Sequence, residues 1–149
     1  MNESDKLRLI EAAVEARQGA VAPYSKFKVG AALLLPDGGI LTGANVESAS
    51  YGLTCCAERV ALFKALTSGH REFQAIAVVA RVKGGPMPCG ACRQLLAEYA
   101  PNAAVFVADV TRPKNIRRFR LEKLLPLAFR GETHLMGKPS LSKTGGGRE

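Results

Sequence analysis

The sequence has no long apolar segment and no recognisable secretory signal. Its longest apolar run, residues 75–80, falls far short of the ~20 residues that a membrane-spanning helix needs. The N-terminal stretch Met1–Lys6 is polar and lacks the apolar core of a signal peptide. We therefore expect an intracellular, cytoplasmic protein with no membrane partner.

Acidic side chains are also scarce: the 149 residues include 13 of them against 21 lysines and arginines, a net charge of +8. Residues 1–111 hold 11 basic and 10 acidic side chains, whereas residues 112–149 hold 10 and 3, so the excess lies near the end of the chain. A nucleic-acid partner would explain such a charge. The basic cluster, however, includes no stacking residue beyond Phe119, which favours a solvated surface and makes nucleic acid an unexpected partner. Its members are Arg112, Lys114, Arg117, Arg118, Arg120 and Lys123.

The hydrophobic pattern indicates one α/β domain without internal repeats. Hydrophobic residues make up 47% and charged residues 23%, which excludes a disordered chain, a collagen-like repeat and a coiled coil. We expect a helix at 4–17, with Ser4 as its N-cap and Leu7, Ile10 and Val14 on its apolar face. Further helices are expected at 54–68, 91–99 and, as a short turn, 121–125, and strands at 27–35, 40–46, 73–80 and 104–108.

These elements predict a layered domain with a mixed sheet. The first two strands would form an antiparallel hairpin across the turn at 36–39, and the later strands would be parallel through helical crossovers. We expect the folded domain to occupy residues 1–130 and residues 131–149 to form a polar basic tail, partly disordered.

Four cysteines lie in the middle of the chain, and three of them are placed to bind one metal ion. Cys56 opens the second predicted helix, and Cys89 and Cys92 open the third, so two helix starts can bring three thiolates together. Three protein ligands and an open position are typical of catalytic zinc, and Glu58 is close enough to touch a water in that position. We interpret Cys55 as a buried small hydrophobic residue.

Two other interpretations of the cysteines are weaker. A redox pair would need only the C-x-x-C and would leave Glu58 and the third cysteine without a role. A structural site with four cysteines would need both Cys55 and Cys56, which point about 100° apart at a helix start. Because zinc with three thiolates has a net charge of −1, we also expect a compensating positive charge, for which Arg59, next to Glu58, and the two helix N-termini are the candidates.

Several segments resemble the small homotetrameric, zinc-dependent cytidine deaminases of the cytidine/deoxycytidylate deaminase superfamily. C-x-E followed by P-C-x-x-C is the zinc-deaminase pattern. The likeness covers roughly residues 5–130 in the family's order. Its motifs are PYSKFKVGAA at 23–32, GANVE at 43–47, CAER at 56–59, PCGACRQ at 88–94 and LLPLAF at 124–129.

The resemblance implies a three-layer α-β-α sandwich with a mixed five-stranded sheet. It implies hydrolysis of cytidine and deoxycytidine to uridine and deoxyuridine with release of ammonia, as in pyrimidine salvage. A zinc-bound hydroxide would attack C4 and Glu58 would shuttle protons. One Zn²⁺ per subunit would be held by Cys56, Cys89 and Cys92, with Arg59 hydrogen-bonded to the thiolates. The implied substrate-binding residues are Phe27, Asn45, Glu47, Tyr51, Ala57 and, reaching a neighbouring subunit of a homotetramer, Phe129.

Simpler roles exist for the substrate-binding set. Asn45 and Glu47 could cap the following helix, and Phe27 and Phe129 could be packing residues, which is the default for an aromatic side chain on a strand. Rival functions are a blasticidin-type deaminase, a nucleic-acid deaminase and a non-catalytic zinc module that binds nucleic acid. The pair Asn45 and Glu47 and the segment 124–129 favour a nucleoside substrate.

Overall fold

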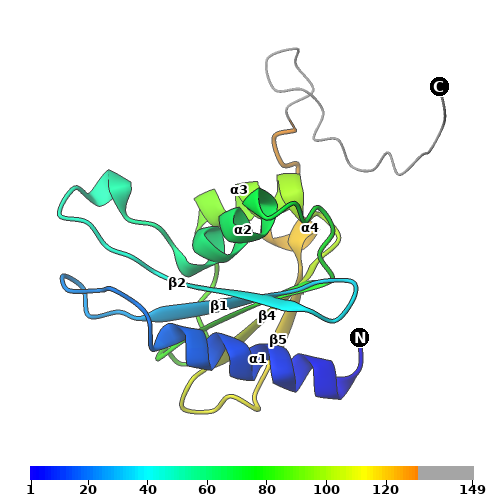
Figure 1. Ribbon diagram of the computed structural model, residues 1–149, viewed down its shortest axis with the longest axis horizontal. Coiled ribbons are helices and arrows are strands. Elements are labelled where there is room, and N and C mark those ends of the chain that lie inside the picture. Colours follow the sequence, from blue (N-terminus) through cyan, green and yellow to red (C-terminus); the bar gives the residue numbers. More distant parts are fainter. Residues whose placement is uncertain (131–149) are drawn as a thin grey trace.

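Five strands form one mixed sheet in the computed structural model, which describes residues 1–130 (Figure 1). The strands are β1 (Val29–Leu34), β2 (Ile40–Ala44), β3 (Ala75–Ala80), β4 (Ala104–Asp109) and β5 (Arg117–Arg120). Their order across the sheet is β2-β1-β3-β4-β5. β1 is antiparallel to β2 and β3, β3 is parallel to β4, and β5 is antiparallel to β4. The predicted fold class is therefore confirmed.

The predicted hairpin is present, and each strand differs slightly from its expected bounds. Gly38 takes a left-handed conformation (φ 86°) in the turn between β1 and β2, which glycine adopts without strain. The first strand begins at Val29 rather than at residue 27, so Phe27 precedes the sheet. The periodicity missed β5, because this edge strand pairs with β4 alone and is mostly charged and exposed.

Helix α1 (Glu3–Arg17) begins with a different cap from the one expected. The Asn2 side chain accepts the Asp5 N–H at 2.8 Å and the Asp5 carboxylate accepts the Asn2 N–H at 3.2 Å. This capping box, rather than Ser4, starts the helix. The buried face is Leu9, Ile10 and Ala13, whereas Leu7, which we expected on that face, is exposed.

The remaining helices are η1 (Tyr51–Leu53), a single 3₁₀ turn, α2 (Ala57–Thr67), α3 (Gly90–Tyr99) and α4 (Leu121–Leu124). The second predicted helix therefore begins three residues later than expected. Residues before it form the 3₁₀ turn and a bridge between Cys55 and Val46, which hold Cys56 at the helix start.

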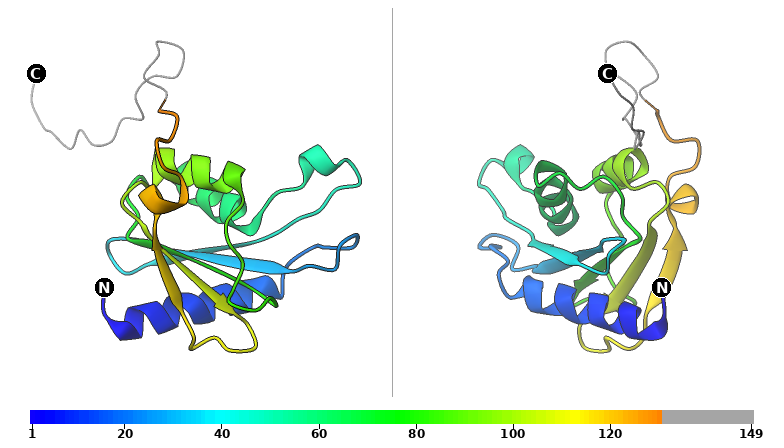
Figure 2. Two further views of the ribbon diagram at one scale, coloured as in Figure 1. Left: turned by 180° about the vertical axis from the view of Figure 1, so that it is seen from behind. Right: turned by 45° about the vertical axis from the view of Figure 1, so that its right-hand side comes forward.

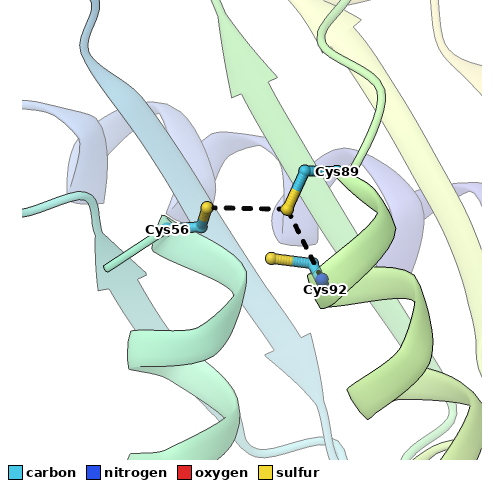
Figure 3. Close-up of side chains that lie close together, drawn as sticks. All are labelled: Cys56, Cys89 and Cys92. Atoms are coloured by element: carbon cyan, nitrogen blue, oxygen red, sulfur yellow. Dashed lines mark hydrogen bonds between the residues drawn. The ribbon is translucent and has the colours of Figure 1, made fainter. Parts of the chain in front are cut away.

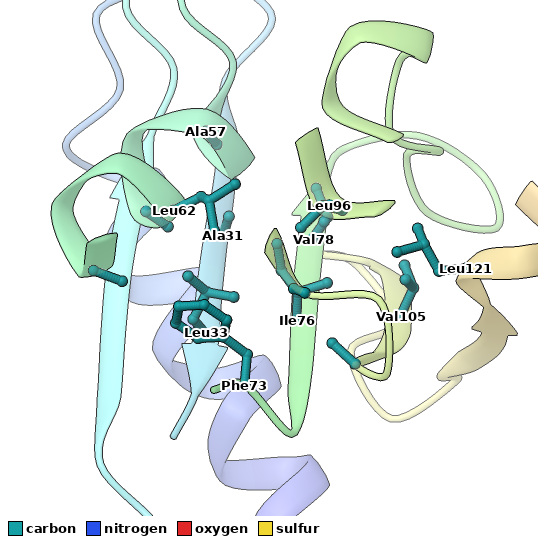
Figure 4. Packing of buried hydrophobic residues seen from close by; sticks show 14 of the residues in the cluster. Ala31, Leu33, Ala57, Leu62, Phe73, Ile76, Val78, Leu96, Val105 and Leu121 are labelled. Atoms are coloured by element: carbon teal, nitrogen blue, oxygen red, sulfur yellow. The ribbon is translucent and has the colours of Figure 1, made fainter. Parts of the chain in front are cut away.

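Helices cover both faces of the sheet, which makes three layers (Figure 1). α1 packs on one face against side chains such as Ala32, Ala77 and Phe106. α2 and α3 pack on the other, where Leu62 and Leu96 meet Leu33, Ile76 and Val105 (Figure 4). This second core holds the starts of α2 and α3 side by side. Within residues 1–130, no helix has the length and apolar character needed to cross a membrane.

Candidate functional site

The starts of α2 and α3 bring three thiol groups together. Cys56 is the N-cap of α2 and Cys89 is the N-cap of α3, with Cys92 in the first turn of α3. Their sulfur atoms lie within 4.8 Å of one another and point into a shared space (Figure 3). Cys89 also accepts the Cys92 N–H, at 3.5 Å. In the described part of the chain, these three residues make up the one group of metal-ligating side chains found.

The spacing of the sulfur atoms fits one zinc ion. Two thiolates bound to a tetrahedral zinc at ~2.3 Å lie about 3.8 Å apart. The sulfur atoms of Cys56 and Cys89 are 3.8 Å apart. Three soft sulfur donors are ligands that zinc prefers, and two helix N-termini favour their negative charge. The cluster therefore suits zinc with one coordination position left for a water or substrate.

A guanidinium group lies next to the thiols. The Arg59 Nη2 donates to the Cys56 sulfur at 3.3 Å and to the Thr54 carbonyl oxygen at 3.3 Å. Hydrogen bonds from Cys92 and Arg59 lower the pKa of Cys56 to about 5, and the hydrogen bond to Cys56 raises the pKa of Arg59. The pKa of Cys92 is raised because its thiol donates to Cys56 and is buried. Arg59 thus occupies the place expected for the compensating cation.

Glu58 is buried beside the cysteine cluster. Glu58 is 5% exposed, and this burial raises the pKa of its carboxyl group to about 7. The charge of Cys56 adds to the effect. A carboxyl group in this setting can exchange a proton with a reacting water or ligand. Glu58 lies in the first turn of α2, two residues after Cys56, and is close enough for the charge of Cys56 to affect its pKa.

Cys55 differs from its expected environment. It is half-buried rather than buried, and its backbone pairs with Val46 through hydrogen bonds of 2.8 and 3.0 Å. Burial raises the pKa of its thiol, so it remains protonated. This bridge joins the segment after β2 to the segment before α2. Because Val46 precedes Glu47 and Cys55 precedes Cys56, the bridge links Glu47 to the cysteine cluster through the backbone.

Two loops extend past the same end of the sheet next to the cluster, as Figure 2 shows for the segments before β1 and after β2. Val21 and Val46 form a bridge between these loops. Between them lies an open hollow of about 270 Å³ whose lining includes Tyr24, Ser25, Glu47 and Tyr51. Tyr51 is 84% exposed and forms part of η1.

Glu47 does not cap a helix. Its carboxylate accepts the backbone N–H groups of Tyr24 (3.1 Å) and Ser25 (3.0 Å) and the hydroxyl of Ser25. These bonds, above all the one from the Ser25 hydroxyl, hold the pKa of Glu47 below its ordinary value. Glu47 is therefore an ionised acceptor at the edge of the hollow.

Asn45 is buried, and its amide group binds the backbone around Phe27. The amide donates to the Phe27 carbonyl oxygen and accepts the Val29 N–H, both at 2.8 Å. Phe27 itself is 42% exposed, which excludes the core role considered for it. Ala57 is fully buried, so its methyl group belongs to the core and only its backbone is available to a ligand.

Residues 124–129 are bound to α3 by two side chains for which the sequence analysis predicted no role. Arg93 donates to the carbonyl oxygens of Pro88 (2.8 Å) and Leu124 (2.9 Å), and Gln94 donates to that of Phe129 (2.9 Å). The Phe129 side chain is 62% exposed. Because both donors follow Cys92 directly, the segment 124–129 is attached to the helix of the cysteine cluster.

The α-β-α fold and the three-cysteine cluster beside a buried carboxyl define a zinc-dependent enzyme. The sequence model described as the cytidine and deoxycytidylate deaminase zinc-binding region matches residues 3–108. The chain belongs to this family, as the sequence motifs predicted. Zinc as the cofactor is likewise confirmed by this match and by the cluster.

Several cytidine deaminases are similar to this chain along nearly their whole length. A cytidine deaminase of Halalkalibacterium halodurans is 51% identical over 86% of this chain and 96% of its own, and one of Sporosarcina psychrophila is 48% identical over 86% and 93%. A solved cytidine deaminase from Burkholderia pseudomallei shares 49% identity and a TM-score of 0.79, covering 87% of this chain and 100% of its own.

Proposed function

We propose that the protein hydrolyses cytidine and deoxycytidine to uridine and deoxyuridine and releases ammonia. The observation that supports this most is the cluster of Cys56, Cys89 and Cys92 with the buried Glu58 next to it. The similar proteins named above are cytidine deaminases, which favours cytosine as the base.

The reaction replaces the C4–N bond of cytosine with a C4–O bond from water. Zinc held by the three cysteines would act as a Lewis acid and lower the pKa of a water molecule towards ~7. Glu58 accepts a proton of the attacking water and delivers it to ring nitrogen N3, which makes C4 a better electrophile. A second proton passes through Glu58 to the amino group, and ammonia leaves. One buried carboxyl serves both steps because it gives back each proton that it receives.

The substrate would lie between the cysteine cluster and the hollow. The Glu47 carboxylate is an acceptor for a sugar hydroxyl, and the segments before β1 and after β2 offer the exposed rings of Phe27 and Tyr51. Asn45 holds Phe27, and its amide nitrogen has a second N–H that the bond to Phe27 does not use. The first turn of α2, at Ala57, presents backbone N–H groups without intrahelical partners.

The test follows the fall in absorbance as cytidine becomes uridine, with ammonia measured in parallel. Zinc-loaded protein should turn over cytidine, and removing zinc with a chelator should abolish turnover until zinc is restored. Glu58→Gln should retain one zinc and lose nearly all turnover. Fully loaded protein without turnover, or Glu58→Gln with wild-type turnover, would refute the proposal. Blasticidin S serves as the comparison substrate.

We also propose a cytoplasmic homotetramer whose neighbouring subunits complete each active site. Exposed apolar side chains near the site support this: Leu127 is fully exposed, Tyr51 is 84% and Leu53 74% exposed, and Phe129 is 62% exposed. Free thiols in a metal cluster suit a reducing compartment. Sedimentation equilibrium should give four times the chain mass of 15.9 kDa. A monomer that is fully active would contradict the shared site.

The predicted tail, residues 131–149, lies outside the described residues.

A further inference from the structure

Ser25 joins two residues of the proposed substrate site that are far apart in the sequence. Its hydroxyl donates to the Glu47 carboxylate, and the same oxygen accepts the Phe27 N–H at 3.0 Å. Its backbone N–H also donates to Glu47, at 3.0 Å. One small side chain therefore contacts both the residue expected at the sugar and the residue expected at the base.

We propose that Ser25 is a positioning residue for nucleoside binding: its hydroxyl group fixes the Glu47 carboxylate and the Phe27 backbone relative to each other. This inference rests on the proposed function, because it takes Glu47 and Phe27 as substrate contacts. It assigns Ser25 no contact with the reacting atoms.

The hydrogen-bond geometry leaves one direction free at Glu47. A carboxylate accepts about four hydrogen bonds. Three are used by Tyr24 and Ser25, so the carboxylate is held in one orientation with acceptor capacity left for a single substrate hydroxyl. The same bonds lower the pKa of Glu47, and the hydrogen bond from the Ser25 hydroxyl is the main cause. Without the Ser25 hydroxyl, the carboxylate would keep the two backbone N–H bonds, lose the third bond and gain rotational freedom.

The Phe27 backbone is held on both sides. Ser25 accepts its N–H and Asn45 binds its carbonyl oxygen. Between Ser25 and Phe27, Lys26 has a φ of 61°, a left-handed conformation that is strained for a residue with a side chain. Such a residue persists where its surroundings determine the backbone, and the Ser25 hydroxyl bridges this turn.

A turn-forming role alone is the competing explanation, because a serine hydroxyl often accepts the N–H two residues ahead. Asp37 offers a control for turn formation away from the site. Its carboxylate accepts the N–H two residues ahead, that of Gly39, at 2.8 Å in the turn between β1 and β2, and it does not line the hollow. If turn formation were all that mattered, Ser25→Ala and Asp37→Ala would respond alike.

The experiment measures kcat, KM for cytidine, zinc content and melting temperature of zinc-loaded full-length variants. Ser25→Ala should raise KM by roughly tenfold, as expected for a lost hydrogen bond to a charged group, with kcat within about twofold of wild type. Ser25→Thr keeps a hydroxyl and should restore KM to within about threefold. Asp37→Ala should leave KM within about twofold. These magnitudes follow from the strength of charge-assisted hydrogen bonds.

A double-mutant cycle tests whether Ser25 acts through Glu47. In a Glu47→Gln background, Ser25→Ala should change KM by less than about twofold, because the carboxylate that it orients is gone. Three outcomes would each overturn the positioning role. The first is an unchanged KM in Ser25→Ala, and the second is an equal effect of Ser25→Ala in the Glu47→Gln background. The third is a fall in kcat together with zinc content and melting temperature. Wild-type protein without turnover would refute the proposed function and this role together, whereas active wild type with an insensitive Ser25→Ala refutes only the role.

Discussion

Gly43 of β2 lies directly under the first turns of α2, and a methyl group there should displace the helix that begins at Cys56. A Cβ atom on Gly43 would lie 2.5 Å from the Ala61 nitrogen and 2.7 Å from the Ala57 carbonyl oxygen. Because ordinary contact begins at 3.4 Å, α2 would have to move away from the sheet by roughly 0.9 Å. Neither contact is a flexible side chain that could turn aside.

The displacement should affect both stability and zinc binding in Gly43→Ala. Overpacking of this kind costs about 1–3 kcal/mol in the free energy of unfolding. Ligand distances in a zinc site tolerate deviations of only about 0.2 Å, so a shift of Cys56 relative to Cys89 and Cys92 should be felt at the metal. We expect zinc affinity to fall by roughly tenfold or more.

Urea unfolding and competition with a chromophoric zinc chelator measure the two effects, and two other glycines are controls. Gly30 lies on the opposite face of the sheet, where a Cβ would lie 2.0 Å from the Ala13 carbonyl oxygen of α1. Gly30→Ala should therefore lose stability without a selective loss of zinc affinity. Gly90 lies between Cys89 and Cys92, the two proposed zinc ligands of α3, yet a Cβ there would meet nothing within 4 Å. Gly90→Ala should keep both properties.

The reasoning is refuted if folded Gly43→Ala binds zinc as tightly as the wild type. It also fails if Gly30→Ala loses zinc affinity to the same extent, since zinc binding would then report overall stability rather than the position of α2.

Three further predictions follow from single contacts. Arg59→Ala should weaken zinc binding measured by chelator competition, because it removes the donor to Cys56, whereas Arg112→Ala on the exposed surface should not; equal effects would contradict the charge argument. Asn2→Ala should lower the free energy of unfolding by about 1 kcal/mol in urea titrations, as loss of an N-cap does, and no change would mean that the capping box is unimportant in solution. Arg93→Ala should speed hydrogen exchange across residues 121–130 and leave α1 unchanged, since two carbonyl oxygens lose their donor; uniform exchange across the chain would argue against a local clamp.

Local patterns were sufficient to predict the metal cluster and the central elements. Cys56, Cys89 and Cys92 stand at the starts of two helices, and helix starts can be recognised from sequence. β3 is buried along its whole length and reads as a continuous apolar run. In contrast, β5 depends on pairing with β4, a tertiary contact that no local periodicity reports.

The contacts of the proposed substrate site could not be predicted from local pattern, because they join segments far apart in the chain. The Ser25 hydroxyl meets a carboxylate 22 residues away, and Asn45 binds a carbonyl oxygen 18 residues away. Serine and asparagine in loops usually indicate only solvated turns. Sequence similarity to a family could point to Asn45 and Glu47, but it gave Ser25 no separate role.

Backbone conformation adds a signal that composition hides. In residues 1–130, the non-glycine residues with positive φ are Lys26 (61°) and Leu127 (51°), and neither residue type favours that conformation. Lys26 immediately precedes Phe27, and Leu127 lies two residues before Phe129. Each is enclosed by side-chain hydrogen bonds to the backbone, from Ser25 and Asn45 in the first case and from Arg93 and Gln94 in the second. The strained residues therefore lie beside Phe27 and Phe129, whereas Phe63, the third exposed phenylalanine of residues 1–130, lies in the regular helix α2. Strain of this kind persists where the surrounding contacts determine the backbone conformation.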